Sequence, residues 1–481
     1  MSPDAPSSAP RSTEPHVHAF RYDALGRDDA TEIARRIAAG EVSAREVAQA
    51  AIERTQLLQP ALNAVAFAAY DRALTEADKP HTGVFAGVPT IIKDNIDVAG
   101  LPTNQGSAAL DAGPAKKDGA FTRQLLSTGL VNLGKSRLPE FGFNASTEYV
   151  GADPVRNPWN PEYSAGASSG GSAALVAAGA LPIAHANDGG GSIRIPAAAC
   201  GLVGLKPSRG RMVLEDADRS LPIRIIGQGV LTRTVRDTAR FFAGAEAYYR
   251  NPKLAPVRLV AGPAATRLRI GVIVDSITGI PTDGETRAAV AHTADLLAGL
   301  GHHVEEAAIP VGESFIEDFS VYWGFLSFAI ATGGKQMYGP SFNSNHTDTL
   351  SKGLAVMYRK KMAKTPQVLY RLRRTYRQYA EMFQQFDVVL SPVVAHTTPE
   401  IGFLSPEQGY EELFRKLTTY TAFTPLNNAS GGPAISLPLA RSRAGLPIGM
   451  HFSADRGDER TLLELAFELE QAQPFALIQQ M

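Results

Sequence analysis

The chain has 481 residues, of which 44% are hydrophobic and 20% are charged, a composition typical of a globular protein. This length suits two or three average domains, or one large α/β enzyme with a shared core. The 47 basic residues nearly balance the 48 acidic ones, so the total charge gives no support for a nucleic-acid partner. The single cysteine, Cys200, excludes an intrachain disulfide and a cysteine-based zinc site.

The first 18 residues are rich in proline, serine and charge and lack the apolar core of a signal peptide. We therefore expect a disordered tail over 1–18. No window approaches about 18 uninterrupted apolar residues, so we expect no membrane-spanning helix. With neither signal, the cytoplasm is the expected location.

The rest of the chain alternates between predicted helices and strands. Helices are expected at 30–39, which Gly40 ends, and at 43–58, which begins with the capping box Ser43-Ala-Arg-Glu46. Strands are expected, in chain order, at 85–92, 130–133, 181–184, 269–274, 303–309, 387–390, 433–437 and 448–452. Further helices are expected at 121–127, 172–180, 285–300, 356–386 with a break at Pro366, and 459–471. This alternation predicts an α/β architecture with helices on both faces of a sheet.

One stretch, Gly129-Leu-Val-Asn-Leu-Gly134-Lys135-Ser136, matches the phosphate-loop pattern letter for letter. That motif needs a strand before its first glycine and a helix that begins at its lysine. Here the order is reversed, because a predicted helix precedes Gly129 and a predicted strand lies inside the motif. We therefore expect a helix end and a core strand at this place, and no nucleotide site.

The stretch Gly166-Ala-Ser168-Ser-Gly170 matches the pattern of a nucleophile elbow, which requires an apolar strand directly before it. The preceding residues 157–164 are polar and interrupted by prolines, which disfavours this interpretation. In an elbow, the residues available to complete a triad with the serine would be His396, His451 and Asp387.

A second glycine-rich turn runs from Asp188 to Ser192, in the sequence Asp-Gly-Gly-Gly-Ser. Its amides can converge on one point, which suits an oxyanion, and its serine suits a nucleophile. Asp188 and Arg194 bracket the turn and are expected to pair across it as structural support. A tight turn between a strand and a helix remains the alternative. The candidate oxyanion donors are the amides of Gly189, Gly190, Gly191 and Ser192.

A nucleophilic serine needs a base, and Lys93 ends the apolar strand expected at 85–92. Burial there would disfavour the charged amine and lower its pKa from about 10.4. To act near neutral pH the amine must lose about 3 pKa units, which corresponds to about 4 kcal/mol. The sequence alone does not bring Lys93 and Ser192 together.

Several other polar residues have simpler interpretations. None of the ten histidines shows metal-ligand spacing, and His185, close to the second turn, either contacts substrate or packs inside. Cys200 lies in a run of small residues and is expected to be an inert core thiol. The basic stretch 358–381 is expected to be the solvated face of a helix.

Taken together, these motifs resemble the amidase signature family. Lys93-Asp-Asn is similar to the family's strand-end lysine motif, and residues 166–172 resemble its glycine-serine loop, with Ala167 in place of a glycine. Residues 188–207 resemble its nucleophile segment. The resemblance extends from about residue 28 to the end of the chain and leaves 249–386 poorly anchored, as a variable and partly helical insertion.

The resemblance implies one α/β domain over residues 19–481, built on a large, twisted, mixed sheet with helices on both faces. It implies that Ser192 is the nucleophile, that Ser168 bridges on a cis peptide bond, and that Lys93 is the base. It also implies an amide-cleaving hydrolase that needs neither metal nor cofactor. Such an enzyme would act on a small-molecule amide as a monomer or a homodimer, away from nucleic acid and membranes.

The expected substrate rests on finer similarities. In the A subunits of tRNA-dependent amidotransferases the nucleophile is typically followed by Ile-Arg-Gln-Pro, whereas Ile195 takes the glutamine position here. This departure favours a free-standing hydrolase, while a glutamine amidotransferase subunit and a non-enzymatic binding relative remain alternatives. The motifs look most like those of 6-aminohexanoate cyclic dimer hydrolases, and aryl-amide- and urethane-cleaving amidases share the pattern. The candidate pocket residues, chosen by position near the motif loops, are Asn144, Gln228, His396, Phe423 and Asn427.

Overall fold

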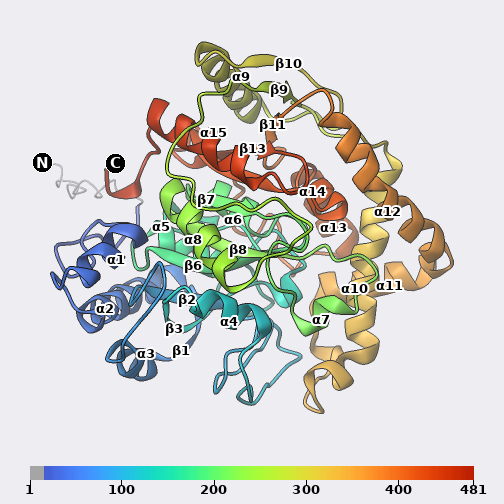
Figure 1. The fold of residues 1–481 in the computed structure, drawn as a ribbon. Helices are drawn as coiled ribbons and strands as arrows, with labels where there is room; N and C mark the ends of the chain where they lie inside the picture. The colour runs from blue at the N-terminus through green and yellow to red at the C-terminus, as the bar shows by residue number, and fades with distance from the viewer. Residues whose placement is uncertain (1–15, 481) are drawn as a thin grey trace, which may run out of the picture.

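The computed structural model describes residues 16–480, and an eight-stranded mixed sheet forms its centre (Figure 1). In spatial order the strands are β10 (His303–Glu306), β9 (Arg269–Val272), β11 (Val388–Pro392), β13 (Pro447–Ser453), β12 (Ala434–Arg441), β7 (Val203–Lys206), β8 (Gly227–Thr232) and β6 (Ile183–Asp188). The pairs β10–β9 and β9–β11 are parallel, and the other pairs in this sheet are antiparallel. The expected α/β architecture is confirmed.

A second, three-stranded sheet lies beside β6 and consists of β1 (Val65–Ala68), β3 (Val131–Ser136) and β2 (Pro89–Lys93). The Thr90 hydroxyl on β2 donates to the Ile183 carbonyl at 3.0 Å, and the Lys93 amide donates to His185 Nδ1 at 3.2 Å. Side chains, and not a backbone ladder, therefore join β2 to β6 at the seam between the two sheets. The short hairpin β4 (Arg156–Asn157) and β5 (Asn160–Ser164) stands apart from both.

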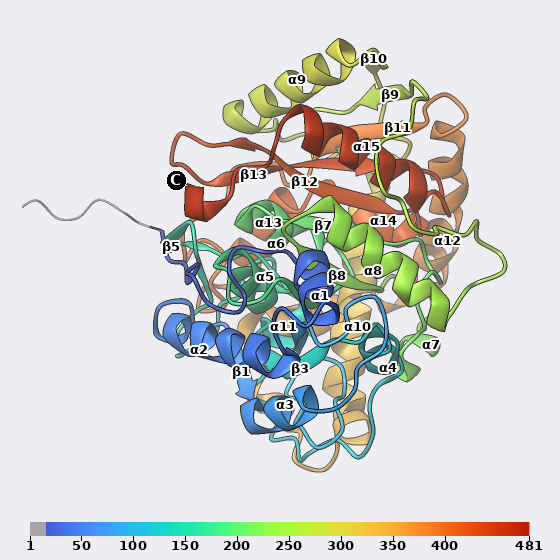
Figure 2. The same ribbon diagram turned by 60° about the vertical axis from the view of Figure 1, so that its left-hand side comes forward.

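Helices cover both faces of the large sheet (Figure 2). The helices that carry or flank this core are α1 (Ala30–Ala38), α2 (Ala44–Leu62), α3 (Tyr70–Ala77), α4 (Ala120–Leu126), α5 (Gly170–Ala177), α6 (Arg194–Cys200), α7 (Asp216–Arg219), α8 (Val235–Tyr248), α9 (Gly284–Gly299) and α15 (Glu459–Ala472). Helices α8 and α15 pack on one face, and α5 and α6 pack together on the other.

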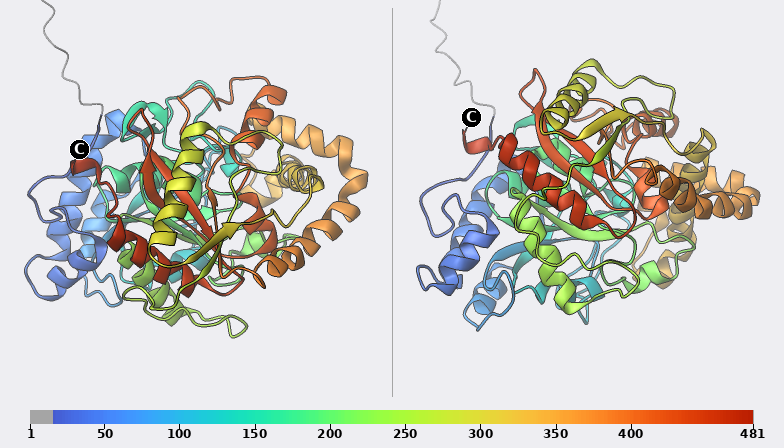
Figure 3. Two further views of the ribbon diagram at one scale, coloured as in Figure 1. Left: turned by 90° about the horizontal axis from the view of Figure 1, so that it is seen from above. Right: turned by 45° about the horizontal axis from the view of Figure 1, so that its top comes forward.

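The remaining helices are α10 (Ser314–Tyr338), α11 (Thr349–Lys361), α12 (Thr365–Met382), α13 (Tyr410–Tyr420) and α14 (Pro425–Ser430). They gather at one end of the sheet, where α10, α11 and α12 form a separate layer (Figure 3). Residues 249–386 thus supply this helical layer, and they also supply β9, α9 and β10 to the main body.

Local sequence signals account for several boundaries. The capping box is present, because the Ser43 hydroxyl accepts from the Glu46 amide while the Glu46 carboxylate accepts from the Ser43 amide. Pro366 stands in the first turn of α12, after a 3-10 turn that separates α12 from α11. The expected break in this helical stretch is therefore confirmed.

Some expected boundaries shift. The strand expected at 85–92 is shorter, because residues 85–88 form a turn that the Val88 amide closes on the Phe85 carbonyl at 3.0 Å. Residues 1–15 of the expected tail lie outside the described residues, whereas the Val17 amide donates to the Pro158 carbonyl at 2.8 Å. Within residues 16–480, every helix is too short or too polar to cross a bilayer.

Candidate active site

The amine of Lys93 is buried at the seam between the two sheets. All five residues of β2 are buried, and Lys93 at its end is 0% exposed. Its Nζ lies 2.6 Å from Ser168 Oγ and 2.7 Å from Asn187 Oδ1. Burial lowers the pKa of Lys93 to about 7, against the opposing effect of the Asp188 carboxylate. The amine can therefore exist in its neutral form near neutral pH.

Ser168 occupies the turn that leads into α5, and the Ala167–Ser168 peptide bond is cis. Gly142 packs closely on this serine, since a Cβ on Gly142 would lie 3.0 Å from Ser168 Oγ. The next residue, Ser169, donates its hydroxyl to the Ser192 carbonyl at 2.6 Å. The loop that holds Ser168 is thereby tied directly to the turn that holds Ser192.

Ser192 lies in the turn between β6 and α6, which Asp188 closes. The Asp188 carboxylate accepts from the Gly191 amide at 2.7 Å and from the Ile193 amide at 3.1 Å. Gly191 has a φ of +138°, and a Cβ there would come within 2.4 Å of Thr424 Oγ1. Glycine is therefore required at this position by both its backbone conformation and its close contact.

The expected oxyanion donors differ in their availability. The Gly191 amide already donates to Asp188 Oδ1. The amides of Gly189, Gly190 and Ser192 have no hydrogen-bond partner within residues 16–480, and neither does the Ser192 hydroxyl. The structure thus leaves three donors free beside the Ser192 hydroxyl, and it does not join that hydroxyl to Ser168 by a hydrogen bond.

Asp188 and Arg194 form a buried, two-bond ion pair. Arg194 Nε and Nη2 each lie 2.9 Å from a different oxygen of Asp188, and both side chains are 0% exposed. Burial alone would raise the pKa of Asp188, but Arg194 holds it well below its usual range. Arg194 also donates to Asn428 Oδ1 at 2.7 Å and to the Thr424 carbonyl at 3.0 Å. The pair therefore anchors the turn to α14.

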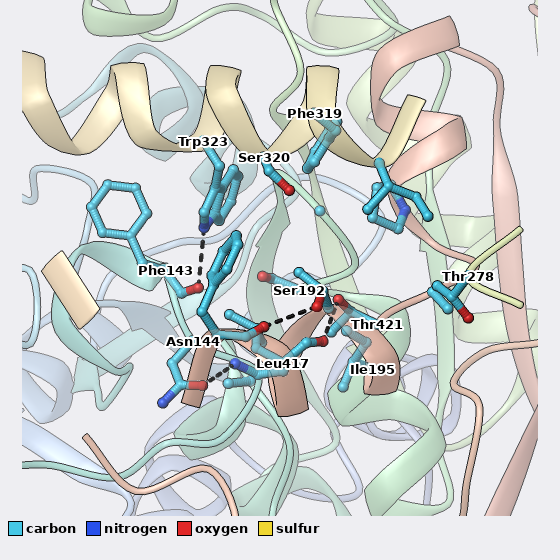
Figure 4. A pocket seen from close by; sticks show the side chains of 18 of the residues that line it. Phe143, Asn144, Ser192, Ile195, Thr278, Phe319, Ser320, Trp323, Leu417 and Thr421 are labelled. Carbon is cyan, nitrogen blue, oxygen red and sulfur yellow. Dashed lines mark hydrogen bonds between the residues drawn. The ribbon is translucent and has the colours of Figure 1, made fainter. Parts of the chain in front are cut away.

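A cavity opens over Ser192, and α10 forms its roof (Figure 4). Phe319 and Trp323 point from α10 toward Ser192, and Trp323 Nε1 donates to the Phe143 carbonyl at 3.2 Å. No charged side chain lines this cavity within the described part of the chain. The apolar lining includes Phe143, Ile195, Ile277, Phe315, Phe319, Trp323, Phe414 and Leu417, and the hydroxyls come from Thr278, Ser320, Thr418 and Thr421.

Comparison with known proteins decides the family. The "Amidase" family model matches residues 46–463. The chain is 51% identical over 464 residues to "Putative amidase AmiC" of Mycobacterium leprae, covering 96% of this chain and 99% of that one. It is 33% identical over 483 residues to a 6-aminohexanoate-cyclic-dimer hydrolase of Paenarthrobacter ureafaciens, covering 93% and 95%.

The chain belongs to the amidase signature family. Two solved structures share its fold with a TM-score of 0.83. A 6-aminohexanoate cyclic dimer hydrolase complexed with substrate is 30% identical, with 94% of this chain and 98% of that one covered. A bacterial aryl acylamidase of the amidase signature family is 27% identical, with 94% and 97% covered. The protein is therefore an amide-hydrolysing enzyme.

Of the five expected pocket residues of this amidase, one lines the cavity. Asn144 does so, although its Nδ2 donates to the Leu404 carbonyl at 2.7 Å and its Oδ1 accepts from the Ala145 amide at 2.8 Å. Both ends of the side chain are thus held by the backbone. Asn144 contributes to the wall of the pocket and has few free hydrogen-bonding positions for a ligand.

The other four expected pocket residues lie outside this lining. Gln228 Oε1 is 3.1 Å from His185 Nε2, and His396 Nδ1 is 2.8 Å from the Thr397 carbonyl. Phe423 packs in a separate apolar cluster. Asn427 is 2% exposed and lies beside Arg194, 3.2 Å from its Nη1. Proximity in sequence to the motif loops is therefore a poor guide to the pocket of this amidase.

The other sequence hypotheses can be placed as well. In the phosphate-loop match, Lys135 is buried in β3, with its Nζ 3.0 Å from Asp94 Oδ1, as expected for a core strand. His185 is buried behind Lys93, where burial lowers its pKa to about 3, and it lies outside the cavity lining.

Cys200 is buried, and its burial raises the pKa of the thiol, as expected for an inert core cysteine. Two of the residues considered as triad partners of Ser168 in a nucleophile elbow have other partners. Asp387 forms an ion pair with Arg269, and His451 Nε2 lies 3.0 Å from Arg194 Nη1. Among the described residues, no cluster of three or more histidine, cysteine or acidic side chains could hold a metal ion.

The aromatic roof of the pocket was not expected from the sequence. Phe315, Phe319 and Trp323 recur every four residues along α10, a spacing that places them on one face of a helix. Apolar and aromatic residues occur around most of this helix, so the sequence does not distinguish the face that lines the cavity. The four-residue aromatic spacing was the available signal.

The Asp188–Arg194 pair generates a stability prediction. Replacing Arg194 with methionine leaves the Asp188 carboxylate buried without its partner, and we expect a loss of about 3–5 kcal/mol in the free energy of unfolding, measured by urea denaturation. Arg35→Met, which removes exposed ion pairs with Glu32 and Glu41, is the control and should change stability little. Equal stability of Arg194→Met and wild type would contradict this role.

Proposed function

We propose that this amidase hydrolyses small or oligomeric uncharged amides, including aryl amides and their carbamate analogues, through an acyl-enzyme on Ser192. The observation that carries the proposal is the 2.6 Å contact between the buried Lys93 amine and Ser168 Oγ. Here a neutral amine contacts a serine hydroxyl, and the neighbouring turn supplies a second serine and amides without hydrogen-bond partners. This arrangement suits acyl transfer.

The proposed reaction begins with proton transfer. Lys93 takes the proton of Ser168 while Ser168 takes that of Ser192, and the Ser192 oxygen forms a bond to the substrate carbonyl carbon. The carbonyl electron pair moves onto oxygen as an oxyanion. The amides of Gly189, Gly190 and Ser192 are the proposed donors to this oxyanion, because the Gly191 amide is engaged by Asp188.

The second half of the reaction returns the proton. The carbon–nitrogen bond breaks as the Lys93 ammonium, through Ser168, protonates the leaving nitrogen, which departs as an amine. Water then passes a proton to Lys93 through the same relay, and its oxygen forms a bond to the ester carbonyl carbon. The bond from that carbon to the Ser192 oxygen breaks as the relay returns the proton to Ser192, and the carboxylic acid leaves. Each proposed step uses only water and side chains or amides of the chain.

The lining of the cavity supports an uncharged substrate. A charged group moved from water into the aromatic space between α10 and Ile195 would lose its hydration without an ionic partner. Aromatic rings on α10 suit an aryl or aliphatic group beside the scissile amide. Two relatives are named for a cyclic aminohexanoate dimer and for aryl acylamides, and the amide group of both kinds of compound carries no charge.

The same lining disfavours the rival function of a glutamine amidotransferase subunit. Glutamine carries an α-ammonium and an α-carboxylate, and the cavity offers neither a fixed anion nor a fixed cation to them. We accordingly propose a free-standing cytoplasmic hydrolase, as a monomer or homodimer, and not a subunit of a tRNA-dependent complex.

Removal of the proposed relay generates the first prediction of function. Ser192→Ala, Ser168→Ala and Lys93→Met should each lower kcat/KM on an acyl anilide by at least about 100-fold, because each removes a group that moves a proton or attacks the carbonyl. Lys117→Met, at a side chain 79% exposed, is the matched lysine control. Full activity of either Ser192→Ala or Lys93→Met would refute the mechanism.

The pKa of Lys93 generates a second prediction. Below a pH of about 7 the amine is protonated and cannot accept a proton, whereas above it the neutral base predominates. We therefore expect kcat/KM for a non-ionising anilide to rise with pH through a limb near pH 7 and then level off. A flat profile between pH 5 and 9 would be inconsistent with a lysine base.

The pocket generates a third prediction. Trp323→Ala removes an aromatic wall and should lower kcat/KM for an acyl anilide by roughly 3- to 10-fold, since an aromatic contact contributes about 0.5–1.5 kcal/mol. Hydrolysis of acetamide, which has no aryl group to contact Trp323, should change much less. Tyr370→Ala, at an exposed aromatic side chain on α12, serves as the control. Equal losses on both substrates would argue against a pocket role.

A further inference from the structure

We infer that Asn95 and Asn187 form an interlocked amide pair that orients the Lys93 amine, so that its lone pair points at Ser168. This inference rests on the proposed function, because it assigns a positioning role in the same proton relay. The two asparagines are not among the residues that line the cavity, and their contacts with Lys93 and with each other carry the argument.

The pair closes a ring of hydrogen bonds at the seam between the sheets. Asn187, the last residue but one of β6, accepts at Oδ1 from Lys93 Nζ at 2.7 Å and from Asn95 Nδ2 at 3.1 Å. In return, Asn187 Nδ2 donates to Asn95 Oδ1 at 3.1 Å. Asn187 is 6% exposed, so water offers its amide few alternative partners.

This ring decides which end of Asn187 faces the amine. An asparagine amide has an accepting oxygen and a donating nitrogen, and its orientation follows from its hydrogen bonds. Turning Asn187 alone would set its NH₂ group against two other donors, Lys93 Nζ and Asn95 Nδ2. Turning both amides would make the Lys93 lone pair accept from Asn187. Only the observed arrangement presents a pure acceptor to the amine and keeps the lone pair free.

The chemistry of the relay needs that free lone pair. A neutral amine has two N–H bonds and one lone pair. If one N–H is donated to Asn187, the amine is oriented and its lone pair can accept the proton of the Ser168 hydroxyl 2.6 Å away. After the transfer, the ammonium still donates to Asn187 while another N–H returns the proton to Ser168. Asn187 thus serves both halves of the reaction without exchanging a proton itself.

Asn187 should also affect the pKa of Lys93, because an acceptor favours the charged form of the donor. The other titratable groups around the amine are few. Asp188, also on β6, is paired with Arg194 and still raises the pKa of Lys93, whereas His185 stays neutral because burial lowers its pKa to about 3. On β2 and β3, Asp94 and Lys135 neutralise each other at 3.0 Å. A change at Asn187 is therefore expected to be visible in the pH profile.

The test compares two replacements of Asn187 in the full-length enzyme, with kcat and KM for an acyl anilide measured from pH 5 to 9. Asn187→Leu should lower kcat roughly 10- to 100-fold with little change in KM, since a hydrogen bond to a charged group is lost. Its acidic limb should move to lower pH. Asn187→Asp, which keeps the shape and adds a negative charge, should move that limb to higher pH by roughly 1 unit or more.

A double-mutant cycle tests the interlock. Asn95→Ala frees the Asn187 amide to turn and should lower kcat by roughly 3- to 10-fold, and adding it to Asn187→Leu should cost no further activity. Asn251→Leu, at a half-buried asparagine that bonds the Gly210 carbonyl, controls for loss of a structural amide and should leave the pH limb in place. Thermal unfolding of every variant confirms that it is folded.

The inference is overturned if the two Asn187 variants leave the pH limb unmoved. It is also overturned if the fold-losses in kcat from Asn95→Ala and Asn187→Leu simply multiply in the double variant. Failure of the proposed function would give a different result. In that case Lys93→Met or Ser192→Ala would retain hydrolysis in the wild-type background. If those two variants lose activity while the Asn187 variants leave the pH limb unmoved, the orienting role of the asparagine pair is rejected and the proposed function is retained.

Discussion

The burial of one amine is the constraint on which the rest of the site depends. Lys93 lies where the two sheets meet through side chains, so no solvent hydrates its charge. The nearby Asp188 carboxylate raises the pKa of that amine, but burial outweighs it and the pKa falls to about 7. Asp188 in turn is held by Arg194 in a two-bond pair, which fixes the glycine turn beside the amine.

The parts of the proposed chemical centre can each be recognised in the sequence, but their assembly cannot, because Lys93 lies 75 residues before Ser168. Their joint roles were implied only by the resemblance to the amidase signature family. An apolar strand that ends in lysine indicates a buried amine, and three glycines between an aspartate and a serine indicate a tight turn with a fixed carboxylate. The availability of the amides was not predictable. Four consecutive N–H groups look equivalent in a sequence, yet the Asp188 carboxylate engages that of Gly191 and leaves its neighbours free.

The pocket was predicted poorly, for a physical reason. Its roof comes from α10, more than 100 residues after Ser192, and only tertiary packing brings Phe319 and Trp323 over the glycine turn. Residues near the motif loops, such as Asn427, instead support the ion pair behind the turn. Sequence proximity to a motif therefore led to a residue that supports the ion pair, whereas the aromatic wall of the cavity comes from a distant helix.

The placement of α10 has a consequence for how such an enzyme can change. Its aromatic face closes the cavity, yet none of its side chains bonds Lys93, Ser168 or the Asp188–Arg194 pair. Substitutions on this helix would therefore reshape the cavity and leave the contacts of Lys93, Ser168 and Asp188 in place. The fold thus separates these contacts from the aromatic wall of the cavity, an arrangement that would let substrate range diverge, in nature or in directed evolution, while the proposed relay is retained.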